Sequence, residues 1–141
     1  MLGGVCVPSE SGELGHSDGD VLCHAVVDAM LGAIAAGDIG RHFPPSDARW
    51  KDAPSRVFVE RASGLLAESG WALVNVDVTV ILEKPRLAPL VDDIRVSLAA
   101  MLGLSAGAIS VKAKTNEGLG AIGRQEAVEA QAIVLVEGVS V

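Results

Sequence analysis

The chain has 141 residues, the size of one domain, and half of them are hydrophobic, which is enough to build a core. It shows no run of 18 apolar residues and no basic-then-apolar leader, so we expect neither a transmembrane helix nor a secretory signal. The formal net charge is −7 and the Lys and Arg residues are scattered, which argues against nucleic acid or a membrane surface as partner.

The first half of the chain predicts one short strand and two helices. Residues 1–7 predict the strand. Apolar residues at helical spacing predict a helix over residues 20–36, which Ser17 or Asp18 would cap. Residues 41–54 are polar and contain three prolines, which is typical of a mobile loop. Ser55 is then placed to cap the second helix.

The second half predicts three strands and one helix. Alternation over residues 71–83 puts valines on one strand face and polar residues on the other. A helix follows from Pro89 to Leu102, and strands are expected at 109–115 and 125–137. This order predicts an α+β fold, a two-layer sandwich with a mixed β-sheet and the helices packed on one face. The polar sheet face would be either wet or packed against copies of itself around an axis.

The two cysteines, Cys6 and Cys23, lack the spacing of metal ligands. We therefore expect two buried, reduced thiols, as is usual in a cytosolic protein.

The segment from Gly15 to His24 holds two of the three histidines. His24 lies on the predicted helix, and Asp20 and Asp28 stand one turn away, where a carboxylate could orient a metal-binding imidazole. The alternative is a core histidine bonded to a backbone carbonyl. His16 and Ser17 precede the helix, where a phosphate could bind free amides, although an ordinary capping turn has the same pattern.

A second group of polar residues follows the strand predicted at 109–115. Thr115 and Glu117 offer a hydroxyl and a carboxylate that suit a phosphate with its divalent ion, or they simply end a solvated strand. Arg124 beside Glu126 indicates a surface or interface ion pair. The loop 83–86 could offer backbone groups to a nucleobase, and the residues 38–47 could form a lid or an ordinary connector.

Together these motifs resemble the 2-C-methyl-D-erythritol 2,4-cyclodiphosphate synthase family of the non-mevalonate isoprenoid pathway. The matching segments are residues 16–20 with His24, 37–40, 75–77, 111–117 and 123–124. The resemblance implies an α+β homotrimer with active sites between neighbouring subunits, in the bacterial cytoplasm. It also implies conversion of a cytidine-diphosphate derivative of methylerythritol 2-phosphate to a cyclic diphosphate and CMP.

The resemblance further implies a role for individual residues. His24 matches a zinc ligand, Glu117 a ligand of Mg²⁺ or Mn²⁺, and His16 and Thr115 match groups that stabilise the transition state. The remaining residues match substrate contacts in three segments. They are Ser17, Asp38, Ile39, Gly40, Phe43, Pro44, Pro45, Ser46 and Asp47; Leu82, Glu83, Lys84, Pro85, Arg86, Leu87 and Ala88; and Lys114, Asn116, Ala121 and Arg124.

One departure from the family pattern concerns the zinc site. The family supplies an Asp-x-His pair of zinc ligands from a first strand, which would precede Met1 and is missing from residues 1–141. We expect this single domain to be an incomplete version of the family polypeptide. The alternatives are a non-catalytic trimeric nucleotide-binding or scaffold relative and an unrelated metallohydrolase that uses His16, His24 and His42.

Overall fold

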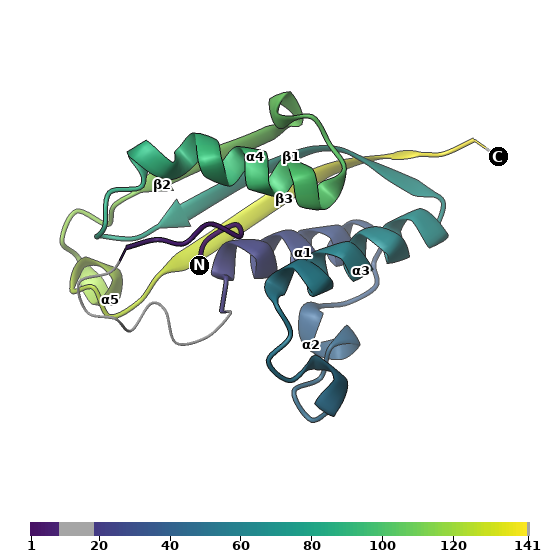
Figure 1. Ribbon diagram of the computed structural model, residues 1–141, viewed down its shortest axis with the longest axis horizontal. Coiled ribbons are helices and arrows are strands. Elements are labelled where there is room, and N and C mark those ends of the chain that lie inside the picture. The colour runs from purple at the N-terminus through teal and green to yellow at the C-terminus, as the bar shows by residue number, and fades with distance from the viewer. Residues whose placement is uncertain (9–18, 141) are drawn as a thin grey trace.

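A mixed sheet forms one layer of the computed structural model, which describes residues 1–8 and 19–140 (Figure 1). Within these residues its strands are β1 (Trp71–Ile81), β2 (Ile109–Lys114) and β3 (Glu129–Gly138), in the order β2-β1-β3. β2 runs parallel to β1 and β3 runs antiparallel to it. The predicted strands 71–83, 109–115 and 125–137 are therefore confirmed with small shifts at their ends.

Helices α1 (Val21–Ala33), α3 (Ser55–Glu68) and α4 (Val91–Leu102) cover one face of this sheet (Figure 1). α1 contacts β3, α3 contacts β1 and α4 contacts β2. Among residues 1–8 and 19–140, two helices of one turn and three 3₁₀ turns join them. They are α2 (Ile39–His42), α5 (Gly120–Gly123), η2 (Ala48–Trp50), η3 (Ala88–Leu90) and η4 (Ala106–Ala108). No helix among the described residues is long and apolar enough to span a bilayer.

The core lies between the helices and the valine face of β1. Val76, Val78 and Val80 are fully buried, as the strand alternation predicts. They share one hydrophobic cluster with Val26 of α1 and Leu98 of α4. The helical periodicity and the strand alternation thus identified the two surfaces that meet in the core. The structure confirms the predicted α+β fold, with helices packed on one face of a mixed sheet.

The opposite sheet face is less polar than expected. Asp77 binds Lys112 across the strands at 2.9 Å, an exposed pair of small energetic value. On β3, however, Ile133 is 75% exposed and Leu135 is 58% exposed, and Ile133 lies opposite Asp77 in the strand register. Large apolar side chains on an otherwise solvated sheet face favour the second of the two expectations, a face that packs against another surface.

Three local predictions in the first half of the chain are wrong. Residues 1–7 form no strand: Leu2 and Val5 make a single bridge around a tight turn in which Gly3 and Gly4 have positive φ. Cys6 is exposed, so only Cys23 is a buried thiol, and burial raises its pKa above the ordinary value and keeps it protonated. Ser55 is the first residue of α3 itself and not its cap, because Pro54 occupies the cap position.

Asp20 is the cap of α1, whereas the predicted caps Ser17 and Asp18 lie outside the described residues. The carboxylate of Asp20 is 1% exposed and accepts three backbone N–H bonds: from Gly3 at 2.8 Å, Gly4 at 2.7 Å and Cys23 at 3.1 Å. Asp20 therefore joins the N-terminal turn to the first turn of α1.

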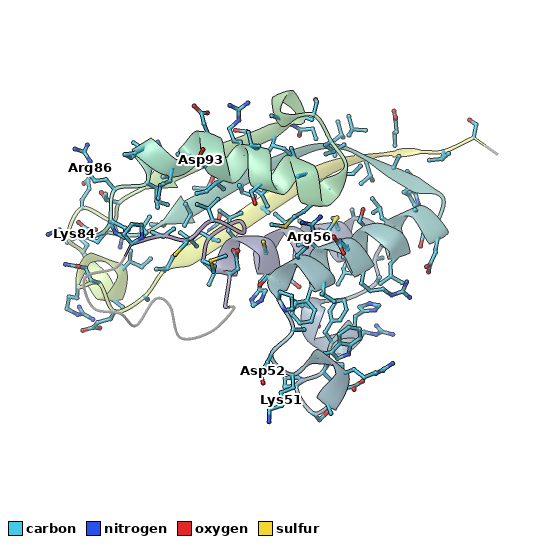
Figure 2. The ribbon with its side chains drawn as sticks, in the orientation of Figure 1. Lys51, Asp52, Arg56, Lys84, Arg86 and Asp93 are labelled. Carbon is cyan, nitrogen blue, oxygen red and sulfur yellow. The ribbon has the colours of Figure 1, made fainter. Side chains whose placement is uncertain are left out.

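Replacing Asp20 by alanine is expected to lower the free energy of unfolding by about 2–4 kcal/mol, because one cap is lost and two further amides lose their acceptor. Urea denaturation of the purified chain measures this. Asp93→Ala is the matched control, since Asp93 is an exposed carboxylate in the first turn of α4 (Figure 2) and should cost about 1 kcal/mol or less. Equal losses in the two variants would contradict the bridging role of Asp20.

Candidate functional site

The parallel pairing of β1 and β2 brings two candidate segments to one end of the sheet. Ile81 lies opposite Lys114 in the register, and the amide of Leu82 donates to the Lys114 carbonyl at 2.9 Å. The chain after β1 (residues 82–88) and the chain after β2 (residues 115–119) therefore start side by side. Lys84 and Arg86 are exposed, and both lie at one end of the molecule (Figure 2).

A tight turn follows β2, and we call residues 115–118 the phosphate turn after the phosphate contact that the sequence predicts for Thr115 and Glu117. The Thr115 hydroxyl oxygen accepts from the amide of Glu117 at 3.3 Å, and the side chain of Asn116 donates to the Leu119 carbonyl at 2.8 Å. Glu117 has φ 53°, in the left-handed region that a residue with a side chain seldom adopts. Such backbone strain persists where surrounding contacts fix it and concentrates at functional sites.

Glu83 contacts the phosphate turn from the neighbouring loop. Its two carboxylate oxygens accept from the amides of Asn116 at 3.2 Å and Gly118 at 3.1 Å. The sequence suggested backbone contacts to a nucleobase for this loop, but not that a side chain of the loop would hold the turn.

α5 packs against the phosphate turn through Gly123, which lies against the backbone of Gly118. A Cβ built on Gly123 would lie 2.1 Å from the carbonyl carbon of Gly118, so only glycine permits this approach. Arg124 and Glu126 form the expected exposed ion pair at 3.1 Å, and Ala121 is exposed on α5 itself.

A second group of candidate residues surrounds His24 on another part of the molecule. The His24 ring lies edge-on to Phe58 of α3, with ring centroids 6.3 Å apart. Phe58 packs against Phe43, and Phe43 packs against Trp50, with ring centroids 4.9 Å apart in each pair. Phe43 is 7% exposed. The segment expected to be a mobile loop is therefore anchored by aromatic side chains.

The carboxylates near His24 serve the backbone and not the imidazole. Asp20 caps α1 as described, and Asp28 accepts from the amide of Ile39 at 2.8 Å. Asp38 caps α2 through the amide of Arg41 at 2.9 Å. The expectation that Asp20 and Asp28 orient His24 is wrong. Helical spacing placed them on the correct helix face but could not reveal these distant backbone donors.

Asp47 belongs to the same aromatic-anchored segment. It binds Arg49 at 2.6 Å, and this guanidinium holds the pKa of the Asp47 carboxyl below its usual range. Because the folded pKa is depressed, the pair's contribution to stability is present at neutral pH and is lost as the pH falls through the folded pKa. Asp47 thus stays ionised at neutral pH.

With this geometry in view, comparisons with known proteins identify the family. A model of the YgbB family matches residues 1–137. The chain belongs to the YgbB family. A 2-C-methyl-D-erythritol 2,4-cyclodiphosphate synthase of Dechloromonas aromatica strain RCB is 55% identical over 139 residues, which are 99% of this chain and 87% of that protein.

Solved structures of YgbB-type synthases share the fold. One, a 2C-methyl-D-erythritol-2,4-cyclodiphosphate synthase, superposes with a TM-score of 0.88 at 38% identity, covering 97% of this chain and 89% of the other. The CDP complex of IspF from Plasmodium falciparum superposes with a TM-score of 0.83 at 33% identity, covering 99% of this chain and 84% of the other. The predicted family and its cyclodiphosphate synthase function are thereby confirmed.

The residues matched to the family motif fall into two groups in this YgbB chain. The first group is residues 82–88 with the phosphate turn and α5, at the end of the sheet. The second is His24 with residues 38–47. In Figure 2, Lys84 and Arg86 of the first group lie at one end of the molecule, and Lys51 and Asp52, which follow residues 38–47 along the chain, lie at the tip of the segment that carries α2. His16 and Ser17 lie outside the described residues.

The zinc role expected of His24 lacks a ligand set in the described part of this YgbB chain. Among residues 1–8 and 19–140, no group of three or more His, Cys, Asp or Glu side chains could hold a metal ion. A zinc ion requires three or four protein ligands, and the described residues offer one imidazole, so they do not fit a zinc site. His42 Nε2 hydrogen-bonds to the Ala36 carbonyl at 2.8 Å, and no described metal-binding group includes His42 and His24 together. His16, the third residue of the metallohydrolase alternative, lies outside the described residues.

Proposed function

We propose that this chain converts 4-diphosphocytidyl-2-C-methyl-D-erythritol 2-phosphate to the 2,4-cyclodiphosphate and CMP, with the phosphate turn and the loop 82–88 binding the cytidine diphosphate part. The observation that carries this proposal is the juxtaposition, at one end of the sheet, of a strained Glu117, the Thr115 hydroxyl and an exposed loop. Membership in the YgbB family supplies the reaction.

The proposed reaction needs no nucleophile from the protein. An oxygen of the substrate's own 2-phosphate attacks the β-phosphorus, forming a new P–O bond. The bond from the β-phosphorus to the oxygen bridging the α-phosphate breaks, and CMP leaves with that oxygen and the electron pair. Catalysis is then positioning and charge stabilisation, in which Thr115 would donate to a phosphate oxygen and the loop 82–88 would hold the nucleoside.

Glu117 is the residue that we propose as the ligand of Mg²⁺ or Mn²⁺. Its carboxylate is exposed on the turn, and Mg²⁺ is typically bound by one or two carboxylates together with substrate phosphates. A bound divalent ion would neutralise charge that develops on the diphosphate. Lys114 is exposed at the end of β2, and we propose that it contributes a further positive charge to a phosphate.

We also propose that the working form is a homotrimer whose sites lie between neighbouring subunits, in the cytoplasm, without nucleic acid or membrane as partner. The separation of the two residue groups within one chain supports sharing of the site, because the His24 group of one copy could face the nucleotide group of another. The exposed Ile133 and Leu135 on the sheet face support a buried subunit contact.

The direct test is turnover. The purified chain is incubated with the cytidylyl substrate and Mg²⁺, and ³¹P NMR follows the appearance of a cyclic diphosphate together with stoichiometric CMP. The same assay is run on a version extended at its N-terminus by the family's Asp-x-His strand, with Zn²⁺ added.

Formation of the cyclic product by either form supports the proposal. CMP binding without turnover by both forms would contradict it and favour the non-catalytic relative. Light scattering on the same samples tests the trimer, and a monomer that turns over would overturn the proposed sharing of sites.

A further inference from the structure

We infer that Glu83 is a positioning residue that locks the phosphate turn onto the loop 82–88, so that binding of the nucleoside and placement of the diphosphate are coupled. This inference rests on the proposed function of these two segments. It concerns a side chain that contacts the turn and not the reacting atoms.

The contact joins residues far apart in the sequence. Oε2 of Glu83 accepts from the Asn116 amide at 3.2 Å, and Oε1 accepts from the Gly118 amide at 3.1 Å, across separations of 33 and 35 residues. Hydrogen bonds to an ionised carboxylate are about twice as strong as those between neutral groups. A two-oxygen grip also fixes orientation as well as distance, because both amides must point at one carboxylate.

The grip explains how the turn keeps its strained conformation. The amide of Glu117 is taken by the Thr115 hydroxyl, so the amides of residues 116, 117 and 118 all have acceptors, two of them on Glu83. Left-handed backbone at a residue with a side chain persists only where neighbouring contacts hold it. Glu83 holds the turn from the neighbouring loop, in addition to the bonds that Thr115 and Asn116 make within the turn, and the Glu117 carboxylate is exposed there.

The loop that carries Glu83 is anchored in the core on both sides of this residue. Leu82 before it is 3% exposed and Leu87 after it is 2% exposed, so both ends of the loop are anchored in the core. Between these anchors Lys84 and Arg86 remain exposed (Figure 2). Movement of this loop is therefore transmitted through the Glu83 carboxylate to the phosphate turn, which is the coupling that we infer.

Amide hydrogen exchange tests the contact without reference to activity. In Glu83→Ala, NMR should show exchange at Asn116 and Gly118 accelerated by about 10-fold or more, while core amides of β1 stay protected. Glu83→Gln, which keeps one acceptor, should show an intermediate change. Glu60→Gln is the matched control, since Glu60 is exposed on α3 and forms an ion pair there with Arg56, and it should leave both amides unchanged.

Kinetics then test the coupling. Glu83→Ala should lower kcat by about 30- to 100-fold, since displacement of reacting groups by about 1 Å costs rate on this scale, and should raise KM by up to about 10-fold, since the substrate carries the same β-phosphate as CDP. The ratio of CDP to CMP affinity should fall by about 10-fold, because the β-phosphate alone depends on the turn. Glu83→Gln should lie between Glu83→Ala and the parent chain, and Glu60→Gln should match the parent.

The outcomes separate the two ideas. Unchanged exchange at Asn116 and Gly118, or accelerated exchange with kcat and the CDP to CMP ratio unchanged, overturns the role of Glu83. Failure of both the parent chain and its N-terminally extended form to make the cyclic diphosphate overturns the proposed function instead, because the exchange measurement still reports the contact. Thermal melts of all variants show whether a loss of kcat comes from unfolding.

Discussion

Gly123→Ala is expected to reduce turnover by about 100-fold or more, through a clash at the back of the phosphate turn and not through any lost contact with substrate. The added Cβ would lie 2.1 Å from the carbonyl carbon, 2.5 Å from the carbonyl oxygen and 2.8 Å from the Cα of Gly118. All three are backbone atoms, so no side chain can swing away. Either α5 or the turn must move, and the turn carries Thr115 and Glu117.

The measurement is kcat and KM for CMP release, with a urea denaturation curve on the same sample. We expect a loss of stability of about 1–3 kcal/mol, as for other overpacked sites, which leaves a folded protein to assay. Gly107→Ala provides the matched control, since its nearest atom beyond the local chain is the Ser105 hydroxyl oxygen at 3.8 Å. If Gly123→Ala keeps full kcat, the turn does not need its observed position for catalysis.

The alternation of β1 shows how far local pattern carries a prediction of this fold. Val76, Val78 and Val80 are fully buried where the pattern places them, and α4 ends at Gly103 in the left-handed conformation, as a glycine stop predicts. Both features depend on residues that are neighbours along one strand or one helix. The helix and strand content was accordingly predictable from the sequence.

The N-terminal turn shows where such reasoning fails. Residues 1–7 predict a short strand, but the amides of Gly3 and Gly4 bind the carboxylate of Asp20, which lies 16 to 17 residues further along the chain. Nothing local indicates that a buried acid will accept those bonds in place of a neighbouring strand. Tertiary hydrogen bonding has overridden the local preference.

In the candidate site, too, residues recognisable from local sequence differ from residues whose partners only the fold reveals. The residue types at Thr115 and Glu117 were recognisable, since a hydroxyl and a carboxylate at this spacing suit a phosphate with its divalent ion. The supporting residues were not: Glu83 and Asp28 act on backbone amides that are 33 to 35 and 11 residues away, respectively. A side chain that serves a distant amide has no signature in its own segment, and only the fold reveals its partner.

Glu117→Gly is expected to lower kcat of the metal-dependent reaction by about 1,000-fold, while it leaves the free energy of unfolding nearly unchanged. At φ 53° a glycine relieves backbone strain of about 1 kcal/mol, and the greater freedom of glycine in the unfolded chain offsets a similar amount. The lost carboxylate removes the proposed ligand for Mg²⁺. Because glycine adopts this backbone conformation without strain, any loss of activity in Glu117→Gly is due to the missing carboxylate.

Two companion variants separate charge from backbone. Glu117→Gln keeps the strained backbone and removes only the charge, so it should lose turnover as Glu117→Gly does. Gln125→Gly is the matched control, because Gln125 has φ 63° on an exposed turn, and it should keep kcat. Mg²⁺ titrations of kcat and urea curves give the readouts. Full activity in Glu117→Gln would show that the strain at this position serves the geometry of the turn and not a metal ligand.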